Sequence, residues 1–217
     1  MHERFRILTV GDSCISVQFA SAIDPVVNAR CIALAASLES LALRGVLDVV
    51  PTYNAVTVHF DPLAADGEAL STELGRLAGT ALPASAADSR TIEIPVSYGG
   101  ASGPDLGAVA EFAECSEADV VQLHMQARYR VYMLGFLPGF AYMGTVDRRI
   151  AMPRLDTPRM RVNAGSVGIA GEQTGIYPCD TPGGWRIIGR TSAKLFDATR
   201  PRPSLLTAGD YVTFVSA

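Results

Sequence analysis

From Arg130 to the C-terminus, the sequence consists of short β-rich segments separated by turns that contain glycine and proline. Four of these segments, at 131–134, 166–170, 185–188 and 211–215, are long enough to form a strand, and none continues into a helical pattern. Many short strands at this spacing are typical of a closed or nearly closed β-barrel. The sequence therefore predicts a β-barrel in this part of the chain.

The N-terminal part has a different pattern, in which strand-like and helix-like segments alternate. Asp24 followed by Pro25 is a typical helix start, and apolar residues then recur at helical spacing until Gly45 is expected to stop the helix. The predicted elements, in chain order, are strands 5–10 and 14–19, helix 25–44, strands 46–50 and 55–60, and helix 67–77. This order predicts an α+β domain, with helices on one face of a small antiparallel sheet.

Residues 81–90 are small and polar and have no periodicity, which favours a linker. We therefore predict an α+β domain at 1–80 and a second domain at 91–217. The second domain is expected to begin with a strand at 91–96 and two helices, at 104–112 and 116–126, before the barrel strands. The overall fold class predicted is α+β.

The composition excludes several classes of function. The formal net charge of −4 and the lack of a basic cluster argue against a nucleic-acid partner. No apolar run approaches the roughly 20 residues of a membrane helix, and the first residues do not resemble a signal peptide. The four cysteines are scattered, without zinc-ligand spacing, so we expect reduced thiols, no metal site and a cytoplasmic protein.

Only one lysine is present, Lys194, in the segment Ser-Ala-Lys-Leu-Phe. A phosphate-binding P-loop requires a lysine after a glycine-rich turn, and Lys194 has no such turn before it. Ser166 does not lie in a nucleophile elbow, and Cys179 has no histidine near it in the sequence. The chain is therefore not expected to hold a nucleotide in a P-loop, or to carry out covalent hydrolysis alone.

Glycine and proline are concentrated in the segments 135–140, 165–171, 173–178 and 182–185. Glycine permits close approach of a ligand to the backbone, although tight barrel corners use it as well. We predict a ligand cleft formed by 135–142, 157–175 and 182–186. The substrate-binding residues predicted there are Arg159, Gly165, Ser166, Thr174, Gly183, Gly184, Trp185 and Arg190.

Several of these side chains have a specific predicted role. Arg159 and Arg190, like Arg154 and Arg161 nearby, could bind a carboxylate or phosphate, or lie solvated on the surface. Thr174 and Gln173 could hydrogen-bond an amide such as a lactam ring, or cap turns, and Glu172 beside them could act as a base. Trp185 could be an aromatic wall or part of the core.

The two residues predicted to be catalytic are His124 and Gln173. A neutral imidazole can transfer protons near pH 7, and His124 ends a predicted helix just before the region rich in glycine and proline. A structural histidine is the alternative for this position.

Five segments carry a resemblance to a known family: Tyr-Met-Leu-Gly-Phe-Leu-Pro-Gly-Phe-Ala-Tyr at 132–142, Thr-Pro-Arg at 157–159, Ala-Gly-Ser-Val-Gly-Ile-Ala at 164–170, Gln-Thr-Gly-Ile-Tyr-Pro at 173–178 and Pro-Gly-Gly-Trp at 182–185. They closely resemble the family that contains KipI and the B-type subunits of bacterial 5-oxoprolinase, also described as allophanate hydrolase subunit 1. Landmarks at 11–12, 45–46, 50–53 and 60–62, and His124, are similar too. Asn163, Glu172 and Cys179 depart from the pattern and bear on the exact substrate.

The resemblance implies a cyclophilin-like β-barrel at 91–217 and an ATP-driven opening of 5-oxo-L-proline to L-glutamate. Three kinds of subunit would share this reaction, so A-type and C-type 5-oxoprolinase subunits are implied as partners, with ATP bound in the complex. Two alternatives stay open: a KipI-like inhibitor of a sensor histidine kinase, and a component of urea or allophanate metabolism.

Overall fold

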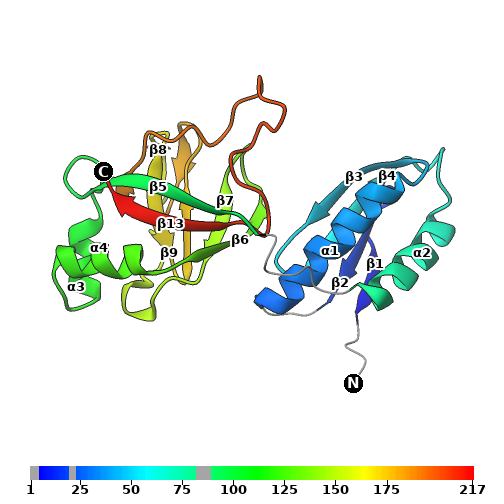
Figure 1. Ribbon diagram of the computed structural model, residues 1–217, viewed down its shortest axis with the longest axis horizontal. Helices are drawn as coiled ribbons and strands as arrows, with labels where there is room; N and C mark the ends of the chain where they lie inside the picture. The colour runs from blue at the N-terminus through cyan, green and yellow to red at the C-terminus, as the bar shows by residue number, and fades with distance from the viewer. Residues whose placement is uncertain (1–4, 20–22, 82–88) are drawn as a thin grey trace. The chain divides into compact units, whose positions relative to one another are not determined.

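The computed structural model describes residues 5–19, 23–81 and 89–217. The chain divides into two compact units, residues 1–88 and 89–217, which are described separately (Figure 1). The predicted linker falls mostly on residues 82–88, which lie outside the described residues, so the linker and the domain boundaries stay predictions. Within the described residues no helix is both long and apolar enough to cross a membrane.

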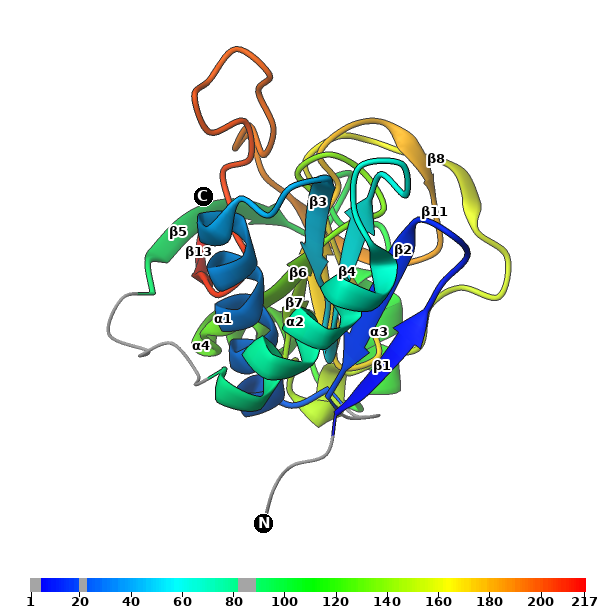
Figure 2. The ribbon, with the colours of Figure 1, turned by 90° about the vertical axis from the view of Figure 1, so that its right-hand side faces the viewer.

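The N-terminal unit is a four-stranded antiparallel sheet with two helices on one of its faces (Figure 2). The strand order is β1-β2-β4-β3. The elements are β1 (Arg6–Thr9), β2 (Cys14–Gln18), α1 (Pro25–Leu41), β3 (Val46–Pro51), β4 (Ala55–Phe60) and α2 (Gly67–Thr80). Alternate residues of β2 and β4 are buried against the helices. The types and the order of these elements agree with those predicted for residues 5–77, and the end of the first helix differs.

The first helix begins where the sequence predicts and ends earlier. The Asp24 side chain accepts hydrogen bonds from the backbone N–H groups of Val26 and Val27, at 2.8 and 2.9 Å, and so caps the N-terminus. The helix was expected to continue to Gly45, but it ends at Leu41 because Ala42 adopts a left-handed conformation, with φ of 45°.

The C-terminal unit contains the predicted closed barrel. Its seven strands are hydrogen-bonded in the order β10-β7-β6-β13-β5-β12-β9, and the β9–β10 pair closes it. The barrel strands are β5 (Thr91–Tyr98), β6 (Tyr129–Leu134), β7 (Ala141–Gly144), β9 (Ser166–Ala170), β10 (Gln173–Ile176), β12 (Arg186–Arg190) and β13 (Tyr211–Ser216). Strands β8 (Arg159–Val162) and β11 (Thr181–Gly183) form a separate two-stranded sheet.

The two helices predicted in this unit are present as α3 (Leu106–Phe112) and α4 (Glu117–Gln126), followed later by a short 3-10 helix, Arg148–Ile150. Ser116 and Asp119 form the predicted capping box at the start of α4: the Ser116 hydroxyl accepts from the Asp119 N–H, and the Asp119 carboxylate accepts from the Ser116 N–H.

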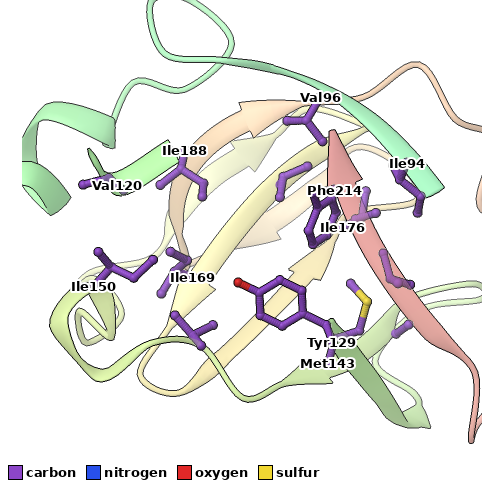
Figure 3. Packing of buried hydrophobic residues seen from close by; sticks show 14 of the residues in the cluster. Ile94, Val96, Val120, Tyr129, Met143, Ile150, Ile169, Ile176, Ile188 and Phe214 are labelled. Atoms are coloured by element: carbon purple, nitrogen blue, oxygen red, sulfur yellow. The ribbon is translucent and has the colours of Figure 1, made fainter. Parts of the chain in front are cut away.

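The barrel interior is filled by apolar side chains from its own strands and from α4. Figure 3 shows Val96, Ile169, Ile176 and Phe214 converging with Tyr129 in this core. The Tyr129 hydroxyl donates to the backbone carbonyl of His124 at 2.9 Å, which satisfies the one polar atom of this ring. The barrel is therefore a packed core, and a ligand site has to lie outside it.

Candidate functional site

A pocket of about 440 Å³ opens outside the barrel core, next to the two-stranded sheet β8–β11. This volume lies within the range of roughly 300–1,000 Å³ that is usual for small-molecule sites. The lining residues are Phe136, Phe140, Tyr142, Arg154, Leu155, Asp156, Pro158, Tyr177, Pro182, Gly183, Gly184 and Trp185. Five of them are aromatic, so the pocket favours a ligand with a flat apolar surface.

The aromatic rings hold one another in place around Phe140. Its ring centroid lies 4.9 Å from that of Tyr142 and 5.4 Å from those of Tyr177 and Trp185, with edge-to-face angles of 68°, 72° and 86°. Such edge-to-face pairs are the favourable geometry for aromatic rings. Burial raises the pKa of both tyrosine hydroxyl groups, so at neutral pH they stay protonated and can donate hydrogen bonds.

Glycines in the motifs make room for these rings. A Cβ atom on Gly175 would lie 3.0 Å from both Phe140 and Trp185. A Cβ atom on Gly183 would lie 2.5 Å from the hydroxyl oxygen of Tyr177. Both glycines are thus required by the close approach of aromatic side chains, which is one of the reasons for glycine in a strand.

The pocket wall at residues 152–155 is fastened to its surroundings through its backbone. The Leu155 N–H donates to the Gly184 carbonyl at 2.7 Å, the Arg186 Nε donates to the Pro153 carbonyl at 3.0 Å, and the Gly171 N–H donates to the Met152 carbonyl at 2.9 Å. These bonds join the wall to β12 and to the turn between β9 and β10. The wall is therefore held in position before any ligand binds.

An ion pair lies next to the part of the pocket wall that contains Trp185. The Arg159 guanidinium donates to Asp105 Oδ1 at 2.6 Å and to the backbone carbonyl of Trp185 at 3.4 Å, while Asp105 Oδ2 accepts from the Ile187 N–H at 2.6 Å. Asp105 is buried, and its charge is compensated by the half-buried guanidinium. Arg159, predicted to bind substrate, thus lies next to the pocket with its charge already paired.

His124 lies in the barrel interior and is fully buried. Its Nδ1 is 2.8 Å from the Tyr98 hydroxyl, and its Nε2 is 3.0 Å from the Thr174 hydroxyl. The Thr174 hydroxyl donates to the Gly168 carbonyl at 3.1 Å, so it accepts from the Nε2–H, and the Nδ1 accepts from Tyr98. These roles are those of a neutral imidazole, the form expected at neutral pH because burial lowers the pKa of His124 to about 3.

The remaining predicted residues lie elsewhere on the barrel. Ser166 pairs with Arg190 of β12, and the N–H of Thr191, the residue after β12, donates to the Gly165 carbonyl at 2.9 Å. The Arg190 Nε donates to the Ala164 carbonyl at 2.9 Å. Gln173 begins β10, half-buried and paired with β7 and β9. None of these residues lines the pocket.

Of the predicted substrate-binding residues, Gly183, Gly184 and Trp185 come together in the pocket wall, and Arg159 lies behind them. Tyr142 and Tyr177 were part of the quoted motifs but were not predicted as site residues. The segment 154–156 was outside the predicted cleft, and Asp105 was missed altogether. Within the described residues, no group of three His, Cys, Asp or Glu side chains could hold a metal ion.

Two comparisons of sequence identify relatives. Residues 5–206 match the family described as carboxyltransferase domain, subdomain C and D. The B-type 5-oxoprolinase subunit of Bacillus subtilis (strain 168) is 39% identical over 225 residues, which cover 99% of this chain and 94% of that protein. A protein of the same name from Escherichia coli O157:H7 is 56% identical over 128 residues, 59% of each protein. A urea amidolyase of Lachancea kluyveri is 31% identical over 148 residues, 61% of this chain and 8% of that protein.

The fold has a solved counterpart. The crystal structure of the protein TTHA0988 is similar with a TM-score of 0.84 and 37% sequence identity, over 94% of this chain. The match covers 40% of that protein, so this chain spans less than half of its length.

Proposed function

The chain belongs to the family described as carboxyltransferase domain, subdomain C and D, and on this basis we propose that it is the B-type component of a multi-subunit 5-oxoprolinase. That enzyme would convert 5-oxo-L-proline to L-glutamate with hydrolysis of ATP. The resemblance found in five sequence motifs and the names of the relatives agree on this family. A cytoplasmic location is part of the proposal, in keeping with four cysteines that are all free.

The observation that supports this function in the geometry is the aromatic pocket. A lactam ring is flat and has apolar methylene groups, and the rings of Tyr142 and Trp185 offer it surfaces of the same kind. Gly183 and Gly184 also line the pocket, and the absence of a side chain lets a ligand approach the backbone closely there. We propose that the lactam binds here, and that the barrel is the cyclophilin-like domain of the family.

The roles of the other predicted residues follow from where they lie. His124 and Gln173 as catalytic residues stay predictions, and the buried neutral imidazole is better suited to positioning β9 and β10 through Thr174 than to moving protons. Gly165, Ser166 and Arg190 stay predicted substrate-binding residues at a separate place on the barrel. ATP would bind within the complex, and the A-type and C-type 5-oxoprolinase subunits would be the partners.

Reconstitution with partner subunits tests this function. The chain is mixed with cognate A-type and C-type subunits, and ATP hydrolysis is measured with and without 5-oxo-L-proline. We expect stimulation by 5-oxoproline in the full mixture and none with the chain alone. Two results would overturn the proposal: full turnover by the isolated chain, or a full mixture that never responds to 5-oxoproline while the chain alone silences a sensor histidine kinase.

A second candidate function rests on the similarity to urea amidolyase, which covers 61% of this chain. In that case the chain would be a component of urea or allophanate metabolism, and the pocket would bind a compound of that pathway. The same mixture distinguishes the two candidate functions when ATP hydrolysis is measured with urea or allophanate added in place of 5-oxoproline. A response to either of them, and not to 5-oxoproline, would favour the second candidate.

A further inference from the structure

Two charged side chains in the pocket wall have no protein partner within the described part of the chain. Arg154 and Asp156 both line the pocket, and neither makes a hydrogen bond or ion pair through its side chain with a described residue. Exposed charges of this kind are usually only solvated. These two differ because they face a pocket whose remaining lining is mostly aromatic and apolar.

The other arginines near the pocket are already engaged. Arg159 is paired with Asp105, and Arg161 with Asp180. Arg186 donates through its Nε to the Pro153 carbonyl, and Arg190 through its Nε to the Ala164 carbonyl. Arg154 is the one basic residue in the pocket lining, and its five N–H donors are available to a ligand.

The backbone around this pair is fixed, although the side chains have no partner. Pro153 and Leu155, on either side of Arg154, are hydrogen-bonded through their carbonyl and N–H groups at 3.0 and 2.7 Å. The Leu155 bond ends on Gly184, so the charged segment and the glycine wall are joined directly. Binding of a ligand to both charges therefore requires little ordering of the protein backbone, and this favours affinity.

We propose that Arg154 binds the carboxylate of the substrate and that Asp156 accepts a hydrogen bond from its ring N–H. This assignment rests on the proposed function, because it presumes that the aromatic pocket holds the lactam. The planar guanidinium of Arg154 can donate two parallel hydrogen bonds to the substrate carboxylate. The Asp156 carboxylate can only accept hydrogen bonds, which suits the ring N–H of the lactam. The substrate class is then a small cyclic amide that bears a carboxylate.

The single tryptophan of the chain, Trp185, lines the pocket and gives a direct binding signal. Its fluorescence is titrated with three probes: 5-oxo-L-proline, 2-pyrrolidinone, which lacks the carboxylate, and cyclopentanecarboxylate, which lacks the amide. Arg154→Gln is expected to weaken 5-oxoproline binding by roughly 10- to 100-fold and to leave 2-pyrrolidinone binding unchanged. Asp156→Ala removes the acceptor, so it is expected to weaken binding of the two lactams, 5-oxo-L-proline and 2-pyrrolidinone, and to leave cyclopentanecarboxylate binding unchanged.

The matched control is Arg148→Gln, since Arg148 is an arginine outside the pocket whose side chain is 89% exposed. It should bind all three probes as the wild-type chain does. The same variants are then compared by their KM for 5-oxoproline in the mixture with the A-type and C-type subunits, where Arg154→Gln should raise KM by a similar factor and change kcat less.

The outcomes separate the assignment from the proposed function. If the mixture turns over 5-oxoproline while Arg154→Gln keeps the wild-type affinity and KM, the assignment is wrong and the function stands. If the mixture never turns over 5-oxoproline but the chain binds cyclopentanecarboxylate in a manner that depends on Arg154, the function is wrong and the carboxylate site stands. A wild-type chain that binds no probe, alone or in the mixture, would overturn both.

Discussion

The buried histidine leads to a specific prediction about stability and pH. His124 has a pKa of about 3 in the folded chain, because burial disfavours its charged form, against an ordinary value of about 6.5 in the unfolded chain. Between these values the unfolded chain binds a proton that the folded chain does not. Stability must therefore fall as the pH falls through this window, and it must be fully present above it.

The magnitude follows from the two pKa values. Lowering the pH from 6.5 to 4.5 should reduce the free energy of unfolding by roughly 2 kcal/mol through His124 alone, since a single proton contributes about 1.4 kcal/mol per pH unit once the unfolded histidine is fully protonated. The carboxyl groups with a lowered pKa, such as Asp147, contribute mainly below this range. The window thus isolates the histidine from most of the acid titration.

The assay compares the wild-type chain with His124→Gln, in which the glutamine amide can still hydrogen-bond Thr174. Urea unfolding is followed at pH 6.5 and 4.5 through the fluorescence of Trp185, which lies in the same unit as His124. Between pH 6.5 and 4.5, we expect the free energy of unfolding to fall by roughly 2 kcal/mol more in the wild-type chain than in the variant. The other two histidines are present in both proteins, so their contributions cancel. An equal loss in both proteins, or a folded-state pKa near 6.5 by NMR, would refute the reasoning.

Two substitutions test the pocket walls. Gly183→Ala places a Cβ atom 2.5 Å from a tyrosine hydroxyl oxygen, so it should reduce 5-oxoproline binding at least 10-fold in a fluorescence titration; Gly79→Ala, where no atom lies within 4 Å, is the control and should bind normally. Asp105→Asn leaves the Arg159 charge uncompensated and should lower the free energy of unfolding by about 1–3 kcal/mol in urea, with a red shift of tryptophan emission. Unchanged stability and emission would show that the pair does not support the wall.

Elements with a strong local signal could be predicted from the sequence, and those without one could not. The alternating residues of β2 and β4 and the capping box at Ser116 gave correct strands and a correct helix start. Strands β7, β8, β10 and β11 have three or four residues each, and most contain glycine or proline. Such residues are normally depleted in strands, so only pairing with neighbours reveals them.

The residues of the candidate site likewise fall into those that a local motif predicts and those that only the tertiary structure reveals. Gly183, Gly184 and Trp185 could be found because a contiguous motif contains them. Asp105 and Arg159 are 54 residues apart, and their pairing is a property of the tertiary structure. The role of His124 was predicted from its residue type, whereas burial decides its charge, and burial cannot be read from a single position.

If the aromatic pocket binds the substrate as we propose, the three departures from the family pattern do not touch it. Asn163 accepts a backbone hydrogen bond from Ser166 in a tight turn, Glu172 pairs with Arg148, and Cys179 is exposed; none of the three lines the pocket. A side chain that does not contact the ligand can change specificity only by moving one that does. The residues that line the proposed site come from the aromatic motifs and from the segment 154–156, which the motifs do not include. Differences in substrate among related chains are therefore expected to follow the identity of positions 154 and 156 more closely than that of positions 163, 172 and 179.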